Sequence, residues 1–136
     1  QVACMDPEMR AILILFDLDD DCAGDLLSRM ASWADTVAPH VPHAIVMARR
    51  EYEAWFIAAA QSLNGTRNFV LENLVDAIDP EVPRNAKGWL AKRMGGAGYN
   101  ETTDQPAFSA RMDLQQALDS SRSFKKLCSE WLKHHR

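Results

Sequence analysis

An apolar run that ends in closely spaced aspartates constrains the fold of this chain more than any other segment. Residues 12–21 read ILILFDLDDD, and the apolar half is typical of a strand buried in a parallel sheet. Ionised carboxylates crowded into one turn repel one another unless water or a cation neutralises them, and Mg²⁺ prefers such oxygen ligands. The segment therefore predicts a metal site at a sheet edge, with Asp17, Asp19 and Asp21 as candidate ligands. The alternative is a solvated Asp-rich turn that caps the next helix, a role open to Asp21 in either case.

A helix and a second strand are predicted after the aspartates. Apolar residues recur at helical spacing over 24–37, and Pro39 and Pro42 end that pattern. The segment 43–48, HAIVMA, is a second short apolar run. Strand, helix and strand in this order predict a βαβ unit with two parallel strands and a right-handed crossover.

Charged residues follow the second strand directly. They are Arg49, Arg50, Glu51 and Glu53, which surround Tyr52. Parallel strands end at the same edge of their sheet, where ligands bind, so we expect these side chains beside the aspartates. Glu51 and Glu53 are candidate catalytic acids, and Arg50 is a candidate phosphate contact. The alternative is an ordinary helix start, with acids in the first turn and arginines at the surface.

The remainder is predicted to be helical, without a further strand. Helices are expected over 54–65, 69–78 and 86–94, from a cap at Thr103 or Asp104 through 114–118, and over 124–133 after Ser121 or Ser123. Leu127, Trp131 and Leu132 are expected on the inner face of the last helix, and the four tryptophans mostly in the core.

Composition indicates one globular domain over residues 1–136. The longest apolar run, 11–16, is too short to cross a membrane, and the N-terminal residues do not form a secretion signal. Three scattered cysteines, Cys4, Cys22 and Cys128, favour free thiols in a reducing cytoplasm. The net charge is −4, and bases outnumber acids after Arg84. An acidic centre with a basic C-terminal part suits a phosphate-handling protein and equally an ordinary helical surface.

Five motifs resemble those of a known family. LFDLDDDC, REYEAWFIAA, NAKGWL, YNETTDQPAFSARMDL and SRSFKKL occur in an order and spacing similar to an uncharacterised bacterial domain family. That family is regarded as Toprim-like, is related to RloB-like proteins, and is often encoded beside ATPases in defence or restriction-type loci. The resemblance covers residues 11–127 and implies an α/β fold: a small parallel sheet from a Toprim-like βαβ unit, followed by a mostly helical C-terminal half.

The resemblance also implies roles for particular residues. In Toprim domains a DxD after a central strand binds magnesium, which corresponds to Asp17 and Asp19. Further acids after the next strand correspond to Glu51 and Glu53. Lys87, Arg122 and Lys126 lie in family motifs. Together with Arg50, they are candidate contacts to nucleic-acid phosphates.

One departure from the family pattern concerns the N-terminus. The family begins with a strand ending in a catalytic glutamate, then a helix and a second strand before the DxD, whereas ten residues precede the apolar run here. Asp6 and Glu8 do not follow an apolar strand. The resemblance therefore implies an N-terminally truncated domain that lacks the upstream general acid or base.

Three functions follow as hypotheses. The first is magnesium-dependent phosphodiester processing of nucleic acid, in a defence or restriction-type system. The second is a non-catalytic binding or regulatory subunit of an ATPase partner, in which an exposed sheet edge is covered by that partner or by a second copy of the chain. The third, a minor one, is a haloacid-dehalogenase-like phosphatase with Asp17 as nucleophile, because its signature also places FDxD after a strand.

Overall fold

The predicted βαβ unit is confirmed in the computed structural model, which describes residues 10–18, 23–72 and 78–134. Strand β1 (Ile12–Asp17) and strand β2 (His43–Ala48) are joined by helix α1 (Ala23–Val37). The strands pair in parallel, from Ile12 opposite His43 to Asp17 opposite Ala48. The described residues contain this one two-stranded sheet and a mostly helical remainder, so the α/β fold class is confirmed.

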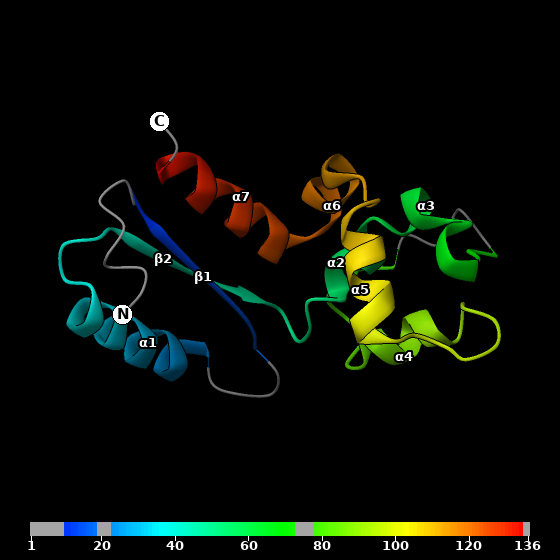
Figure 1. Ribbon diagram of the computed structural model, residues 1–136, viewed down its shortest axis with the longest axis horizontal. Coiled ribbons are helices and arrows are strands. Elements are labelled where there is room, and N and C mark those ends of the chain that lie inside the picture. The colour runs from blue at the N-terminus through cyan, green and yellow to red at the C-terminus, as the bar shows by residue number, and fades with distance from the viewer. Residues whose placement is uncertain (1–9, 19–22, 73–77, 135–136) are drawn as a thin grey trace.

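Two helices flank the strand pair. Helix α1 contacts β2, and the last helix, α7 (Arg122–His134), packs on the same strand. Figure 1 shows α1 and α7 on opposite sides of the strands, with α7 running back along β2 from the helical part of the molecule. Alternate residues of β2 are fully buried, namely Ala44, Val46 and Ala48, as expected for a strand that packs one face against a helix.

The helical half lies beyond the carboxyl ends of the strands (Figure 1). It consists of α2 (Ala54–Ala58), α3 (Ala60–Leu63), the 3₁₀ turn η2 (Thr66–Asn68), α4 (Ala86–Ala91), α5 (Glu101–Ser109) and α6 (Leu114–Ser120), which leads to α7. Apart from the two strands, the described residues add only an isolated antiparallel bridge between Phe69 and Met94. The absence of a further strand in these residues agrees with the sequence prediction.

Several predicted helix boundaries are wrong. The helix expected over 54–65 is broken at Ala59, whose backbone (φ −106°, ψ 20°) leaves the helical region and separates α2 from α3. No helix forms over 69–72, because Phe69 pairs with Met94 and the N–H of Val70 donates to the carbonyl of Arg93 (2.8 Å). The rest of the helix predicted over 69–78 lies mostly outside the described residues.

The cap of α5 also differs from the prediction. Asn100, with an extended backbone, accepts hydrogen bonds from the N–H groups of Thr102 and Thr103 through its side chain. Asp104 turns back and accepts from the N–H of Asn100 (2.8 Å), which completes a reciprocal capping arrangement. Asn100 is therefore the N-cap, in place of Thr103 or Asp104. The start of α7 is as predicted, since the Ser121 hydroxyl accepts from the N–H of Phe124 (3.1 Å).

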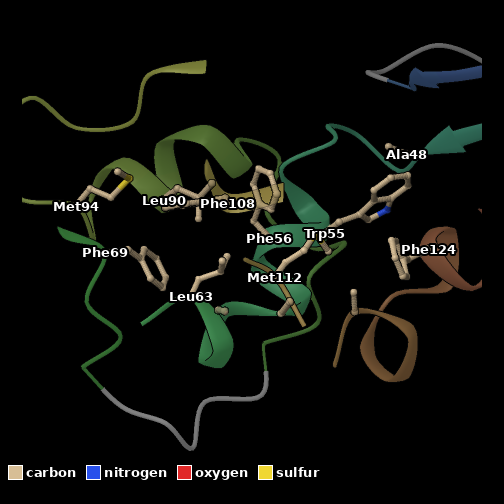
Figure 2. Close-up of a cluster of buried hydrophobic side chains, with 13 residues drawn as sticks. Ala48, Trp55, Phe56, Leu63, Phe69, Leu90, Met94, Phe108, Met112 and Phe124 are labelled. Atoms are coloured by element: carbon tan, nitrogen blue, oxygen red, sulfur yellow. The ribbon is translucent and has the colours of Figure 1, made fainter. Parts of the chain in front are cut away.

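An aromatic core joins the helices (Figure 2). Its largest fully buried side chains include Trp55 and Phe56 of α2, Phe69 after η2, and Phe108 of α5. Phe108 meets Phe56 edge-on at 5.5 Å and Phe69 at 5.8 Å between ring centroids. Edge-to-face aromatic pairs add stabilisation beyond the apolar area that they bury. The core therefore fixes α2, which directly follows the end of β2, against α5.

The inner face predicted for the last helix is only partly correct. Phe124 is buried and Leu127 is half-buried, whereas Trp131 and Leu132 are 52% and 57% exposed. The buried residue in the last turns is Glu130, which takes part in ion pairs. Trp33 on α1 is also exposed, so the expectation that the tryptophans are mostly core holds for Trp55 and, in part, for Trp89.

Two further sequence predictions concern membrane-spanning segments and the state of the cysteines. No helix in the described part of the chain is long and apolar enough to cross a membrane. Cys128 is a free, half-buried thiol whose pKa is raised by burial, while Cys4 and Cys22 lie outside the described residues. A cytoplasmic location stays a prediction.

Candidate functional site

The carboxyl ends of the two strands bring Asp17 beside the segment that follows β2. The N–H of Leu18 donates to the carbonyl of Ala48 (3.0 Å), and the chain then turns at Arg50, whose φ is +71°. This turn lets the N–H of Tyr52 donate to Oδ1 of Asp17 (2.8 Å). A non-glycine residue with positive φ is uncommon and often occurs at functional sites. The structure therefore brings Asp17 beside the backbone of Tyr52 in the segment after β2, while a role for the charged residues 49–53 stays a prediction.

The other predicted metal ligands cannot be placed. Asp19 and Asp21 lie outside the described residues, as do Asp6 and Glu8. Within residues 10–18, 23–72 and 78–134, no three His, Cys, Asp or Glu side chains are close enough together to form a complete metal site. The assignment of Asp17, Asp19 and Asp21 as ligands stays a prediction.

Glu51 links the strand ends to helix α4. Its Oε2 accepts a hydrogen bond from the N–H of Lys87 (3.1 Å) at the start of that helix. The Lys87 ammonium in turn lies 2.7 Å from Oε1 of Glu101. The ion pair with Glu101, together with the charges of Glu53 and Glu51, raises the pKa of Lys87. Lys87 therefore lies at the start of α4 among three acids, of which Glu101 forms its ion pair.

Glu53 is completely buried between α2 and α5. Its Oε1 accepts hydrogen bonds from the hydroxyl of Tyr99 (2.9 Å) and from Nε2 of Gln105 (3.1 Å). Its Oε2 is buried and has no hydrogen-bond partner within the described part of the chain. Burial and the charge of Glu53 raise the pKa of Tyr99 well above its usual range, so this hydroxyl remains a donor. Glu53 thus lies behind the sheet edge and is closed to solvent.

The four predicted phosphate contacts do not lie together. Arg50 is the second residue after β2, and Lys87 lies in the first turn of α4, where its N–H donates to Glu51. Arg122 begins α7, where its Nε lies 3.2 Å from Oε2 of Glu81. Lys126 lies one turn further along α7, pairs with Glu130, and lines a depression with His43–Ile45 at the opposite end of β2 from Asp17.

Glu81, which sequence reasoning missed, ties Arg122 back to the strand ends. Its carboxylate is 4% exposed and accepts from the hydroxyl of Ser121 and the N–H of Ser123 (2.8 Å). Nη1 of Arg49, the first residue after β2, lies 4.0 Å from the same carboxylate. These hydrogen bonds, with the Arg122 charge, outweigh the effect of burial and lower the pKa of Glu81. Glu81 therefore joins β2 to the start of α7 as a charged group.

Lys126 belongs to a second charge cluster, formed with Glu130 and Lys133 on α7, whose contribution to stability depends on pH. Lys126 and Lys133 both pair with Glu130 and lower its pKa to about 2, against 4.5 for an unperturbed glutamate. A lowered folded-state pKa means that the stabilisation is complete above pH 4.5 and is lost as the pH falls toward 2.

We expect Glu130→Gln to lower the free energy of unfolding by about 1 kcal/mol at pH 7, since the two lysines are more than half exposed and screened by solvent. Urea unfolding of the wild type and the variant at several pH values measures the difference. It should shrink toward zero near pH 2; a constant difference between pH 7 and pH 3 would contradict the assigned pairing.

A comparison with family models confirms the expectation of an uncharacterised domain family. The chain belongs to the family described as Domain of unknown function (DUF4276), whose model matches residues 3–131. No curated protein and no solved structure matches this chain.

Proposed function

We propose that this chain is a Toprim-like domain, related to RloB-like proteins, that processes nucleic-acid phosphodiesters with Mg²⁺. The observation that carries the proposal is the hydrogen bond from the Tyr52 N–H to Asp17 (2.8 Å). It fixes the exposed carboxylate of Asp17 at the strand ends, beside the backbone of Tyr52, which directly follows Arg50 and Glu51 in sequence. Acids and bases at the carboxyl ends of parallel strands are typical of phosphate-handling α/β sites. The motif resemblance supports the same class.

The donor chemistry fits Mg²⁺. Magnesium takes oxygen ligands, retains several waters, and is often held by one or two carboxylates together with phosphates of the substrate. Asp17 supplies one such carboxylate, and Asp19 is the second residue of the DxD. A bound Mg²⁺ would neutralise phosphate charge and lower the pKa of a bound water.

The other residues have separate roles in this proposal. Glu51 is half-buried at the same edge and is the acid best placed to act with Asp17. Arg50 and Lys87 bind phosphate oxygens, for which Lys87 must exchange its pairing with Glu101. Glu53 holds Tyr99 and Gln105 in place behind the edge. Arg122 and Lys126 contact more distant parts of a long substrate.

Replacing Asp17 with asparagine tests the proposal. The amide oxygen can still accept from Tyr52, so the fold should be retained, while the charge that attracts Mg²⁺ is removed. We expect Mg²⁺ affinity, measured by calorimetry, and Mg²⁺-dependent cleavage of DNA or RNA each to fall by about tenfold or more.

The matched control is Asp35→Asn, which changes an exposed acid at the far end of α1. It should leave both quantities within about twofold. Equal Mg²⁺ affinity in the Asp17 variant and the wild type would refute the metal role, and a Mg²⁺-binding chain that cleaves neither DNA nor RNA would refute the enzymatic one.

A binding subunit of an ATPase in a defence-type locus is the second candidate. Exposed apolar side chains on the βαβ unit favour it, namely Leu15, Trp33 and Val37. Co-purification with the ATPase encoded beside the gene would support this function, and a chain that stays monomeric and alone in its presence would count against it.

A further inference from the structure

A large cleft lies apart from the strand ends, between α3 and α4 on one side and α6 with the start of α7 on the other. Its volume is about 1360 Å³, and none of Asp17, Glu51, Glu53 and Lys87 lines it, whereas Arg122, the proposed contact to a distant part of the substrate, does. Pockets that hold small ligands are usually several hundred Å³ in volume, so this cleft is large enough for a nucleotide. Its function is therefore a separate question from that of the metal site.

Arg93 is held in a fixed position in this cleft. Its guanidinium lies 3.6 Å from the centre of the Trp89 ring, and its Nη1 donates to the carbonyl of Trp89 (3.1 Å). The Trp89 ring is itself packed against Phe69, which is fully buried in the core. A guanidinium that is already ordered loses little conformational entropy when it binds a ligand.

The charges at this end of α4 are not engaged in ion pairs within the described part of the chain. Across the described residues, neither Arg93 nor its neighbour Lys92 forms an ion pair, although both line the cleft. Three acids also line the cleft, Glu72, Asp79 and Asp119, and none of these described side chains forms an ion pair with Lys92 or Arg93. Asp119 accepts from Gln115 (2.8 Å) and Asp79 from the N–H of Glu81 (3.0 Å). The α4 wall therefore presents two cations to an incoming anion, and one of them is the stacked guanidinium of Arg93.

We propose that this cleft binds a nucleoside phosphate, with Arg93 as the group that binds the phosphate. A guanidinium forms paired hydrogen bonds with phosphate oxygens, and Lys92 adds a second positive charge. The amide side chains of Asn68 and Gln116 also line the cleft. Oε1 of Gln116 accepts from the N–H of Ser62 (3.2 Å), so Gln116 offers its NH₂ group as a donor to a base edge, and Asn68 offers a donor and an acceptor. The phosphate can belong to a free nucleotide or to a nucleotide within a single strand.

Binding of labelled probes distinguishes these two sources. Fluorescence anisotropy with a short fluorescein-labelled single-stranded oligonucleotide measures strand binding, and calorimetry with each ribonucleoside monophosphate and triphosphate measures free-nucleotide binding. Saturable binding in either arm supports the proposal and identifies the source of the phosphate. Absence of binding in both arms at millimolar ligand would overturn it.

Arg93→Gln removes the charge and the stacked plane, and we expect it to weaken the observed binding by about tenfold or more. Arg93→Lys keeps the charge without the planar fork and should fall between this variant and the wild type. Lys92→Gln changes an exposed side chain that the fold does not need, so it tests the cleft even where the Arg93 variants fold poorly, and a loss of about threefold is expected.

Arg111→Gln is the matched control, because Arg111 is exposed and lies outside the cleft. Its binding should stay within about twofold of the wild type. Equal losses in the Arg93, Lys92 and Arg111 variants would show nonspecific charge attraction and overturn the assignment. The Asp17→Asn variant should bind the same probes as tightly as the wild type in the absence of Mg²⁺, which separates this site from the proposed metal site.

Discussion

Replacing Phe56 with alanine is expected to lower the free energy of unfolding by about 3–5 kcal/mol, the usual cost of removing a buried aromatic ring. Phe56 is 0% exposed and lies at the centre of the core in Figure 2. Its ring meets Tyr52 at 5.4 Å and Phe108 at 5.5 Å, both edge-on. The substitution removes both aromatic contacts and leaves a cavity between α2 and α5. Urea unfolding followed by circular dichroism measures the change.

Two further variants locate the source of the loss. Phe56→Leu keeps most of the apolar volume and should cost about 1–2 kcal/mol, mainly through the lost aromatic contacts. Leu114→Ala changes a side chain that is 61% exposed on α6 and should change the stability by about 0.5 kcal/mol or less. Comparable losses in Phe56→Ala and Leu114→Ala would contradict the core that the structure defines.

The βαβ unit was predictable because its signals are local. Each strand is an apolar run of strand length, and the helix between them has a regular apolar stripe ended by prolines. The parallel pairing then follows from the chain order, and the structure places the pairs from Ile12–His43 to Asp17–Ala48. The proximity of Asp17 to the segment after β2 follows from the same geometry.

The errors lie where distant contacts override local preference. Phe69 belongs to an apolar stretch that reads as a helix, yet it pairs with Met94, which lies 25 positions further along the chain. Ala59 gives no sequence signal for the break between α2 and α3, since alanine favours helices. Trp131 continues the apolar stripe of α7 but is half exposed, because the aromatic core reaches Phe124 and does not extend along the whole helix.

The candidate site was predictable only at the strand ends. Tyr99 and Gln105 lie 46 and 52 positions after Glu53, and no residue pattern connects them before the helices are packed. The same holds for Glu81, which meets Arg122 across 41 positions. Tyr99 and Gln105 do occur in the motif YNETTDQPAF, so the motif order marks them, although it does not indicate their partner.

Glu53→Ala is expected to lower the free energy of unfolding by about 2–4 kcal/mol, because it leaves two buried donors without an acceptor and also opens a cavity. The donors are the Tyr99 hydroxyl and the Gln105 amide, both bonded to Oε1. Glu53→Gln keeps an oxygen for them but puts an amide NH₂ where Oε2 has no partner among the described residues, so about 1–2 kcal/mol is expected. Urea unfolding of both variants should give this order.

Glu51→Gln is the matched control for the buried position. Glu51 is half-buried, and an amide oxygen can still accept from the N–H of Lys87, so its stability should change by less than about 1 kcal/mol. Because Glu53 is closed to solvent, Glu53→Gln should keep its Mg²⁺ affinity within about twofold, whereas Glu51→Gln should weaken it. A tenfold or greater loss of Mg²⁺ affinity in Glu53→Gln, at nearly unchanged stability, would contradict this expectation and would support the catalytic role that the sequence predicts for Glu53. The metal would then have to reach Glu53 through an opening of the contact between α2 and α5.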